Sequence, residues 1–273
     1  MLNLPYFASA EVINLGTAND YIFATANSGQ WDGSLLLGSE AHIFGSVAAS
    51  NTLELGAGVI IDGDACASPS TSKNWGATVA GATGACTDFT QLANDISGAA
   101  AKAQSFTGEN LGDVSGSSEI FGDGFQSFLI NNLLLVGGDT LTVNGGVEDY
   151  FIFNVFGVAR LGSGANILLQ GGVAAENVIF NFVANPTSHT FELGGANISG
   201  TFLSSGRTFM IGDGATLNNS RFYSTANIIA NVQDVRFPKN TVDHVPVSEP
   251  ATIAMFVAAG FGLFSMRRRK QIK

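Results

Sequence analysis

The sequence predicts an all-β dominated protein, built as a three-sided parallel β-helix in which short strands are joined by bends. Residues recur at intervals of roughly 18 to 20 positions, and many short apolar runs are interrupted by Gly, Asn and Asp. Only one stretch has clear helical periodicity. With 34 Gly and 45% hydrophobic residues, the chain can turn often and still bury a core. A β-sandwich is the alternative, but it needs no such period.

The first ten residues indicate export. They read MLNLPYFASA, and Ala8-Ser9-Ala10 has the small-x-small form of a signal-peptidase site. A charged n-region and a full apolar h-region do not precede it, so we expect residues 1–10 to be the remnant of a longer signal peptide. A soluble protein with a chance Ala-Ser-Ala is the alternative. The domain that follows is expected to span residues 11–240.

The repeat first appears in the N-terminal part of this domain. Leu37-Gly38 recurs 18 positions later as Leu55-Gly56, and Gly45 recurs at the same offset as Gly63. Apolar residues precede the turn in both copies. A unit of this length is about one coil of a three-sided β-helix, in which each coil pairs its backbone with the next. Glycine is expected at the bends.

The same period returns near the end of the domain. Phe191 and Leu193-Gly194 match Phe209 and Ile211-Gly212, and residues 159–172 (ARLGSGANILLQGG) have a similar form. The runs DYFIFNV and NVIFNF partly alternate apolar and polar residues, which is typical of strands buried on one face.

The two cysteines lie in a loop-like stretch. Cys66 and Cys86 bracket a segment rich in Ser, Thr, Gly and Ala. In an exported protein we expect a disulfide rather than a metal pair, with free buried thiols as the alternative. Closing a loop of about 20 residues would stabilise the fold by roughly 3 kcal/mol.

One amphipathic helix is expected at about residues 88–105. Asp88 can cap it, with Gln91 in the capping-box position. The residues on its apolar face are Phe89, Leu92, Ile96, Ala99 and Ala103. Because the chain has no second such helix before its tail, we expect this one to flank the β structure.

Charge and motifs exclude several functions. The net charge is −10, and without the five tail cations 7 cations face 22 acids, a net charge of −15. No basic surface remains for nucleic acid. His42, His189 and His244 are scattered and form no HExxH or Cys/His ligand pattern. GxSxG and phosphate-loop motifs are absent, so we expect neither catalysis nor a cofactor.

Acidic residues offer the best remaining hint of an enzyme. Asp62 and Asp64 form a close pair, whereas Glu119, Asp123 and Asp139 are dispersed. A polysaccharide-active β-helix would need clustered acids with a cation, and a calcium site would need GGxGxD repeats. Solvated turn acids are the better interpretation of Asp62 and Asp64.

The chain resembles a known group of domains over roughly residues 11–237. The order LGTANDYIF, then the helix, then NVIFNF, GTFLSS and GATLNNSRF carries the resemblance. These segments are similar to the ice-binding-protein-like adhesion domains of bacteria and the related choice-of-anchor A domains. The resemblance implies an irregular right-handed parallel β-helix with one long helix packed beside it. It also implies a cell-surface adhesion role or ice binding.

Ice binding requires a flat and regular face on which Thr and similar residues match the spacing of water. The candidate outward residues lie late in the domain. They are Thr201, Ser204, Ser205, Thr208, Thr216, Asn218, Ser220, Ser224 and Thr225. A polar solvent face explains them equally well, because they form no strict Thr-x-Thr array.

The C-terminus has three parts after a linker at 241–250. Val245, Pro246, Glu249 and Pro250 mark a polar turn, and residues 251–266 are apolar and uncharged. A helix of this length spans about 24 Å, somewhat less than the ~30 Å of a bilayer core. The basic end that follows is Arg267, Arg268, Arg269 and Lys270. Such cations favour the cytoplasmic side of a membrane, which places the domain outside.

This tail resembles the PEP-CTERM sorting signal of Gram-negative bacteria, with Ser248-Glu249-Pro250 in place of Pro-Glu-Pro. The resemblance implies a hydrophobic helix in 251–273, membrane contact through 251–266 and processing by an exosortase-like enzyme. A plain membrane anchor is the alternative.

Together, these features predict an exported, surface-anchored, non-enzymatic β-helical protein of a Gram-negative bacterium, with an adhesion or extracellular-matrix role. Its ligand would be a surface glycan, the matrix or ice. An ice-binding protein is the first alternative and a polysaccharide-active enzyme the second.

Overall fold

The computed structural model describes residues 13–27, 33–185 and 190–237. They form a parallel β-solenoid of about nine turns with one α-helix beside it. Parallel pairing excludes the β-sandwich, because aligned sandwiches are built from antiparallel strands. The expected signal-peptide remnant and the expected sorting tail lie outside the described residues. The tail residues concerned are Val245, Pro246, Glu249, Pro250, Arg267, Arg268 and Arg269. No helix within the described ranges has the length and apolar character needed to span a membrane.

Each turn contributes strands to three faces, which we call A, B and C. Face A comprises, in order along the stack, β10 (Thr83–Gly84), β7 (Ala65–Ala67), β4 (Ser46–Ala49), β1 (Tyr21–Thr25), the ends of β21 (Thr208–Ser224) and β20 (Asn197–Ser204), β18 (Val178–Phe182), β15 (Tyr150–Val155), and the starts of β13 (Phe125–Leu135) and β11 (Glu109–Ser115).

Face B comprises, in the same direction, β8 (Ser70–Lys73), β5 (Thr52–Leu55), β2 (Leu35–Leu37), the starts of β22 (Ile228–Arg236) and β21, β19 (Thr190–Leu193), β16 (Ala159–Leu161), and the ends of β13 and β11.

Face C comprises β9 (Thr78–Val79), β6 (Ile60–Ile61), β3 (His42–Ile43), the end of β22, the middle of β21, the start of β20, β17 (Asn166–Gln170), β14 (Thr140–Asn144) and β12 (Ser118–Phe121). Two short 3₁₀ turns, Gly16–Asp20 and Ala175–Asn177, complete the described elements.

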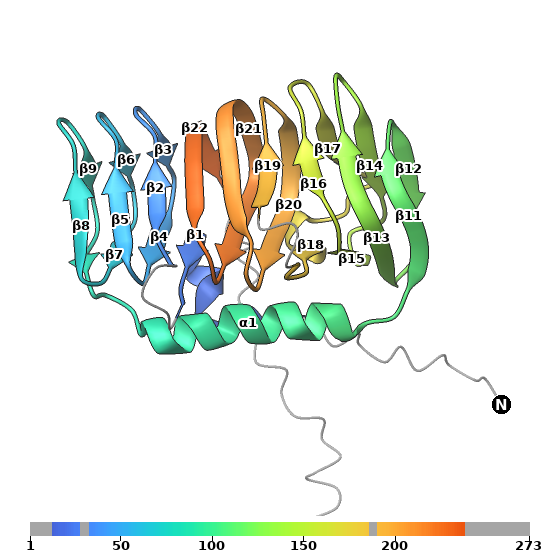
Figure 1. Cartoon of the computed structure of the whole chain (residues 1–273), viewed down its shortest axis with the longest axis horizontal. Coiled ribbons are helices and arrows are strands. Elements are labelled where there is room, and N and C mark those ends of the chain that lie inside the picture. The colour runs from blue at the N-terminus through green and yellow to red at the C-terminus, as the bar shows by residue number, and fades with distance from the viewer. Residues whose placement is uncertain (1–12, 28–32, 186–189, 238–273) are drawn as a thin grey trace, which may run out of the picture. The chain divides into compact units, whose positions relative to one another are not determined.

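The spatial order of the coils differs from their order in the chain. The first coil, β1 to β3, pairs on one side with β4 to β6 and on the other with β21 and β22. The chain builds outward from β1 to β10 and then crosses through α1 (Phe89–Ser105) to the opposite end, where β11 begins. Figure 1 shows α1 running beneath the stack from the β8 end to the β11 end.

The 18-residue repeat is the length of a coil in the N-terminal part. Leu37 pairs with Leu55, and Phe191 pairs with Phe209, each 18 positions apart. Between β15 and β18 the step is longer, since Phe153 pairs with Phe180. The turns between these strands contain extra residues, although the strands themselves still pair in register. The 18-residue period is therefore not visible in the middle of the sequence.

A ladder of phenylalanine rings forms the inside of face A. Neighbouring ring centroids lie 4.7 to 5.6 Å apart with interplanar angles of 8° to 19°. The rings are those of Phe128, Phe153, Phe180, Phe202, Phe222 and Phe23. Neighbouring coils lie about 4.8 Å apart, which is close to the distance between the centroids of stacked aromatic rings. One ring per coil therefore fills this part of the core.

Helix α1 covers the outside of face A. The Asp88 side chain accepts from the backbone N–H groups of Thr90 and Gln91, as expected for its cap. The capping box is not completed, because the Gln91 amide donates to Asp95 instead. Leu92, Ile96 and Ala103 are buried against the sheet.

The cover of α1 changes the burial of two strands from what the sequence indicates. β15 and β18 are buried on both sides, not on one. Their polar positions, Asn154 and Asn181, point at the helix and donate to the carbonyls of Ala103 and Ala100. The polar residue in each of these strands therefore donates a hydrogen bond to a helix carbonyl rather than to solvent.

Candidate functional site

Four of the hydroxyl residues expected to point outward are buried, so that expectation is wrong for them. Their side chains instead hydrogen-bond inside the fold: three donate to backbone carbonyls, and one accepts from the Arg221 guanidinium. They are Thr201, Ser204, Ser220 and Ser224, all 0% exposed.

The other members of that set are spread over three places. Thr208 lies on face B, whereas Thr216 and Asn218 lie on face C. Ser205 and Thr225 lie at the corner between faces A and B, where they line a groove beside α1. The structure thus does not bring the predicted residues together on one surface.

Face B offers a regular exposed surface. From β19 to β5 its strand pairs run without a register shift. Outward side chains repeat about every 4.8 Å from coil to coil and about every 6.6 Å along a strand. Because α1 covers face A, faces B and C are the two sides of the described solenoid that remain open.

The outward residues of face B form two neighbouring ranks, one residue per coil. The first rank consists of Thr190, Thr208, Asn227, Ser34 and Thr52. The second consists of Arg160, Glu192, Met210, Ile229, Leu36 and Glu54. No hydrogen bond joins the hydroxyls of Thr190, Thr208, Ser34 or Thr52 to another described residue. These hydroxyls are therefore available to solvent.

The centre of the second rank is uncharged and its ends are charged. Met210, Ile229 and Leu36 are consecutive, and Met210 is 42% exposed. Glu54 follows on one side, and on the other Arg160 forms an ion pair with Glu192, with N–O distances of 2.7 Å. We call the eight uncharged residues of both ranks the central patch: Thr190, Thr208, Asn227, Ser34, Thr52, Met210, Ile229 and Leu36.

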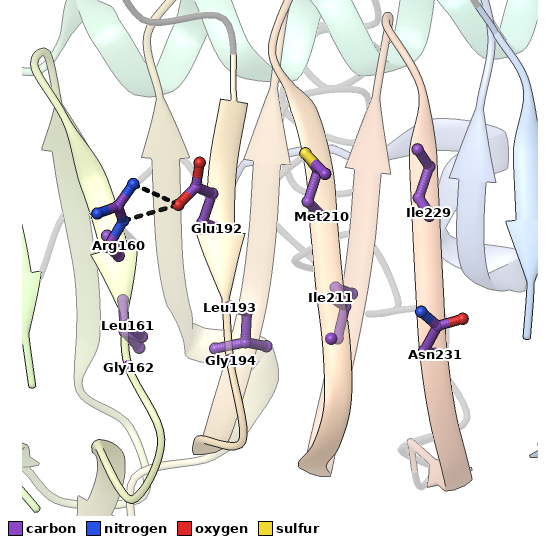
Figure 2. Close-up of a pocket in the computed structure, with 11 residues that line it drawn as sticks. Arg160, Leu161, Gly162, Glu192, Leu193, Gly194, Met210, Ile211, Ile229 and Asn231 are labelled. Atoms are coloured by element: carbon purple, nitrogen blue, oxygen red, sulfur yellow. Dashed lines mark hydrogen bonds and ion pairs between the residues drawn. The ribbon is translucent and has the colours of Figure 1, made fainter. Parts of the chain in front are cut away.

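A shallow groove of about 340 Å³ runs beside the apolar rank. Gly162 and Gly194 border it together with the ion pair of Arg160 and Glu192, and Figure 2 shows the two glycines farther along their strands than this pair. Met210, Ile229 and Asn231 also border this groove. A row of glycines thus lies next to a row of residues with large side chains.

Face C is polar, and some of its polar side chains hydrogen-bond to one another. The Asn166 amide donates to Thr140, and the Asn218 amide donates to Asn197. Its strands also shift register within β20 and β21. The face is therefore less regular than face B.

The acid pair noted in the sequence does not form a joint site. The Asp62 carboxylate pairs with His42 Nε2 at 3.0 Å, whereas Asp64 accepts from the backbone N–H of Ala82. Arg236 stacks on Phe44 nearby, 3.6 Å from its ring centroid. No group of three or more potential metal ligands occurs within the described residues. The sequence indicates solvated turn acids at Asp62 and Asp64, and in the structure each also has a partner in the protein.

The two cysteines are joined in the structure. Cys66 and Cys86 form a disulfide with a Cα–Cα distance of 5.1 Å. It ties strand β7 to the segment that leads into α1. A disulfide of this kind is typical of proteins that fold in an oxidising compartment.

Sequence reasoning missed most of the central patch. Met210 and Glu192 each lie between two residues of the 18-residue repeat, so strand alternation about Phe191 and Phe209 could have placed both outward. No signal in the sequence indicates that β2 adjoins β22, because these strands are nearly 200 residues apart in the chain.

A model of the protein family described as Ice-binding-like matches residues 67–235. The chain belongs to the Ice-binding-like family. The match begins within β7, so the coils formed by β1 to β6 precede the matched region. No curated protein matched the sequence.

Solved structures of low sequence identity share the fold of this Ice-binding-like chain. An ice-binding protein from an Antarctic biological consortium has a TM-score of 0.56 at 16% identity, covering 86% of this chain and 95% of that one. An ice-binding protein from an Antarctic Flavobacteriaceae bacterium has a TM-score of 0.60 at 17% identity, covering 86% of this chain and 50% of that one. One from the Antarctic ascomycete Antarctomyces psychrotrophicus has a TM-score of 0.52 at 15% identity, with 82% and 97% covered.

Proposed function

We propose that this protein binds ice through the central patch of face B. The observation that carries the proposal is that the hydroxyls of Thr190, Thr208, Ser34 and Thr52 lie beside the uncharged side chains of Met210, Ile229 and Leu36 at a constant coil spacing. Membership of the Ice-binding-like family supports it. Ice therefore replaces adhesion, which the sequence favoured, as the leading function.

The physical reason is that ice is a periodic array of hydrogen-bonding oxygens. Hydroxyls held at a fixed repeat can hydrogen-bond to such an array without rearranging, so little entropy is lost on binding. Neighbouring apolar groups such as Met210 and Ile229 leave adjacent waters free to hydrogen-bond to one another. Charged groups hold hydration shells of their own, so Arg160, Glu192 and Glu54 mark the limits of the patch.

We also propose that the protein acts outside the cell and is not an enzyme. The disulfide and the signal-peptide-like start support export. We retain the sorting tail, with membrane contact through 251–266 and an exosortase-like partner, as part of this proposal. A Gram-negative cell surface would then carry the ice-binding face on its exterior.

A charge placed in the patch tests the proposal. We expect Met210→Lys to reduce inhibition of ice recrystallisation and thermal hysteresis at least about tenfold, because the ammonium group retains its own water. Both activities are measured on purified protein at matched concentration.

The matched control is Thr216→Lys, which puts the same charge on face C of the same strand, β21. We expect this control to keep the activity of the unchanged protein. Absence of ice activity in the unchanged protein, or equal losses in both variants, would contradict the proposal.

A further inference from the structure

The first outward rank of face B crosses the seam where β2 of the first coil pairs with β22 of the last. Its members on one side of the seam are Thr190, Thr208 and Asn227, and those on the other are Ser34 and Thr52. Asn227 and Ser34 are therefore neighbours in the rank although 193 positions separate them in the sequence. The spacing of the rank at this point depends on contacts across the seam, because no local turn connects the two residues.

The rank lies outside the strand ladder at the seam and inside it elsewhere. Three of its members are the first residues of their strands and pair within the ladder: Thr190, Thr208 and Thr52. β22 and β2 begin one residue after the rank, at Ile228 and Leu35, and these two residues pair with each other. Asn227 and Ser34 precede the ladder, so strand pairing alone does not join them.

The Asn227 side chain makes the contact that strand pairing leaves out. The backbone N–H of Ser34 donates to Asn227 Oδ1 at 3.0 Å. Within the described residues no backbone carbonyl accepts from this N–H, although the adjacent Gly33 N–H donates to the Ala226 oxygen at 2.9 Å. Gly33 has a left-handed φ of 91°, so the chain turns directly before Ser34. The amide oxygen of Asn227 thereby fixes Ser34 where the chain enters β2.

The opposite end of the same strand pair needs no such side chain. Gly38 follows β2 there, and its N–H donates to the backbone oxygen of Ala230 at 2.8 Å. At position 227 a threonine hydroxyl would not replace the amide, because it is attached to Cβ, one bond nearer the backbone than the asparagine Oδ1. Asn227 is thus the one amide in a rank whose other four members carry hydroxyls, and it stands where the ladder is interrupted.

We propose that Asn227 is a positioning residue of the proposed ice-binding face, and that it acts through Ser34. By accepting from the Ser34 N–H, it holds the hydroxyl of Ser34 in line with those of Thr208 and Thr190. This inference rests on the proposed ice-binding function and gives Asn227 a role in alignment rather than in contact with ice. A face that matches a periodic lattice needs such alignment, because a displaced residue falls out of register with the lattice.

A threonine substitution separates alignment from contact. Asn227→Thr completes the rank of hydroxyls but removes the acceptor of the Ser34 N–H. We expect at least about a fivefold loss of inhibition of ice recrystallisation, because the Ser34 hydroxyl leaves its place in the rank. A residue that only contacted ice would instead keep or raise the activity when a hydroxyl replaced its amide. The exchange of the Ser34 amide hydrogen, measured by NMR, should become at least about tenfold faster.

A double-mutant cycle shows whether Asn227 acts through Ser34. We expect Asn227→Thr to cause no more than about a further twofold loss when it is combined with Ser34→Ala, because the hydroxyl that Asn227 positions is then already absent. A variant that merely destabilised the fold would lose the same factor whether position 34 held serine or alanine. Equal factors in the two backgrounds would therefore overturn the proposal.

The matched control is Asn218→Thr on face C. The Asn218 amide donates to Asn197 Oδ1 at 2.7 Å, so this variant makes the same substitution and also removes a side-chain hydrogen bond. Full activity in this control together with loss in Asn227→Thr supports the proposal, whereas equal loss in both variants overturns it. Full activity in Asn227→Thr while Met210→Lys is inactive overturns the role of Asn227 and leaves the proposed function standing. A protein without ice activity removes the proposed function as well.

Discussion

Arg207 is a buried cation without an acidic partner among the described residues. Its side chain is 0% exposed, and its nitrogens donate to the carbonyl oxygens of Val183, Gly157, Phe156 and Val155. Burial lowers the pKa of its guanidinium to about 10, so the group remains charged at neutral pH. One side chain thereby connects the corners of three successive coils.

We expect Arg207→Met to lower the free energy of unfolding by about 3 kcal/mol, because the carbonyls of Val183, Gly157 and Val155 each lose the one side-chain donor seen among the described residues. Urea denaturation measures this change. The control is Arg160→Met on face B, which removes an exposed ion pair and should cost less than about 1 kcal/mol. Similar losses in the two variants would show that Arg207 does not act through its buried contacts.

At the level of elements, α1 is held by connections at both of its ends. The disulfide between Cys66 and Cys86 joins strand β7 to the segment before α1. The amides of Asn154 and Asn181 bind carbonyls near its C-terminal end, and the Asn181 amide also donates to Asn154. The helix is therefore fixed to coils on both sides of the seam where β1 meets β21.

Removing the disulfide should destabilise the domain without changing the face that we propose binds ice. We expect Cys66→Ser with Cys86→Ser to lower the free energy of unfolding by roughly 3 kcal/mol, because the unfolded chain gains the conformational entropy that the closed loop had removed. Thermal unfolding under non-reducing conditions measures it. Reduction of the unchanged protein should lower the Tm equally, and a variant as stable as the oxidised protein would contradict this account.

Local signals explain which elements could be predicted from the sequence. The cap at Asp88 and the apolar face around Leu92 and Ile96 are properties of one short segment, and the helix has the expected limits. The 18-residue offset from Leu37 to Leu55 is likewise a coil that closes without insertions.

The candidate site could not be predicted in the same way. The central patch combines residues of β19, β21, β22, β2 and β5, and its middle crosses the seam between the first and last coils. Thr201 failed as an exposed residue because it lies beside Ile179 on the outer side of face A, which α1 covers. Ser220 failed because alternation breaks at Asn219, which has a left-handed φ, so that Ser220 lies on the inner side with Phe222. The sequence shows neither the helix cover nor where that break falls.

For the whole solenoid, the β8 end shows how stacking stops. Thr71 and Lys73 occupy the positions that Leu53 and Leu55 hold in the next coil. Leu53 and Leu55 are fully buried, whereas Lys73 is exposed. A charged residue at a core position blocks the addition of another strand, which is a common protection of open sheet edges.

We expect Thr71→Leu with Lys73→Leu to make this end of the solenoid self-associate. The variant should form dimers at concentrations where the unchanged protein is monomeric, because the end coil would then expose leucine beside unpaired backbone groups. Sedimentation velocity measures the oligomeric state. Ser72→Leu is the control, because this residue points away from the core on the same strand. A monomeric double variant would contradict this role for Lys73.

The crossed order of the coils also constrains how the protein is made. In most solenoids each repeat can settle on the one synthesised before it. Here β1 to β3 lack one neighbour until β21 and β22 have left the ribosome, more than 180 residues later. The nascent chain therefore stays incomplete along its midline until almost the whole domain has been translated, a delay that suits the export that we propose.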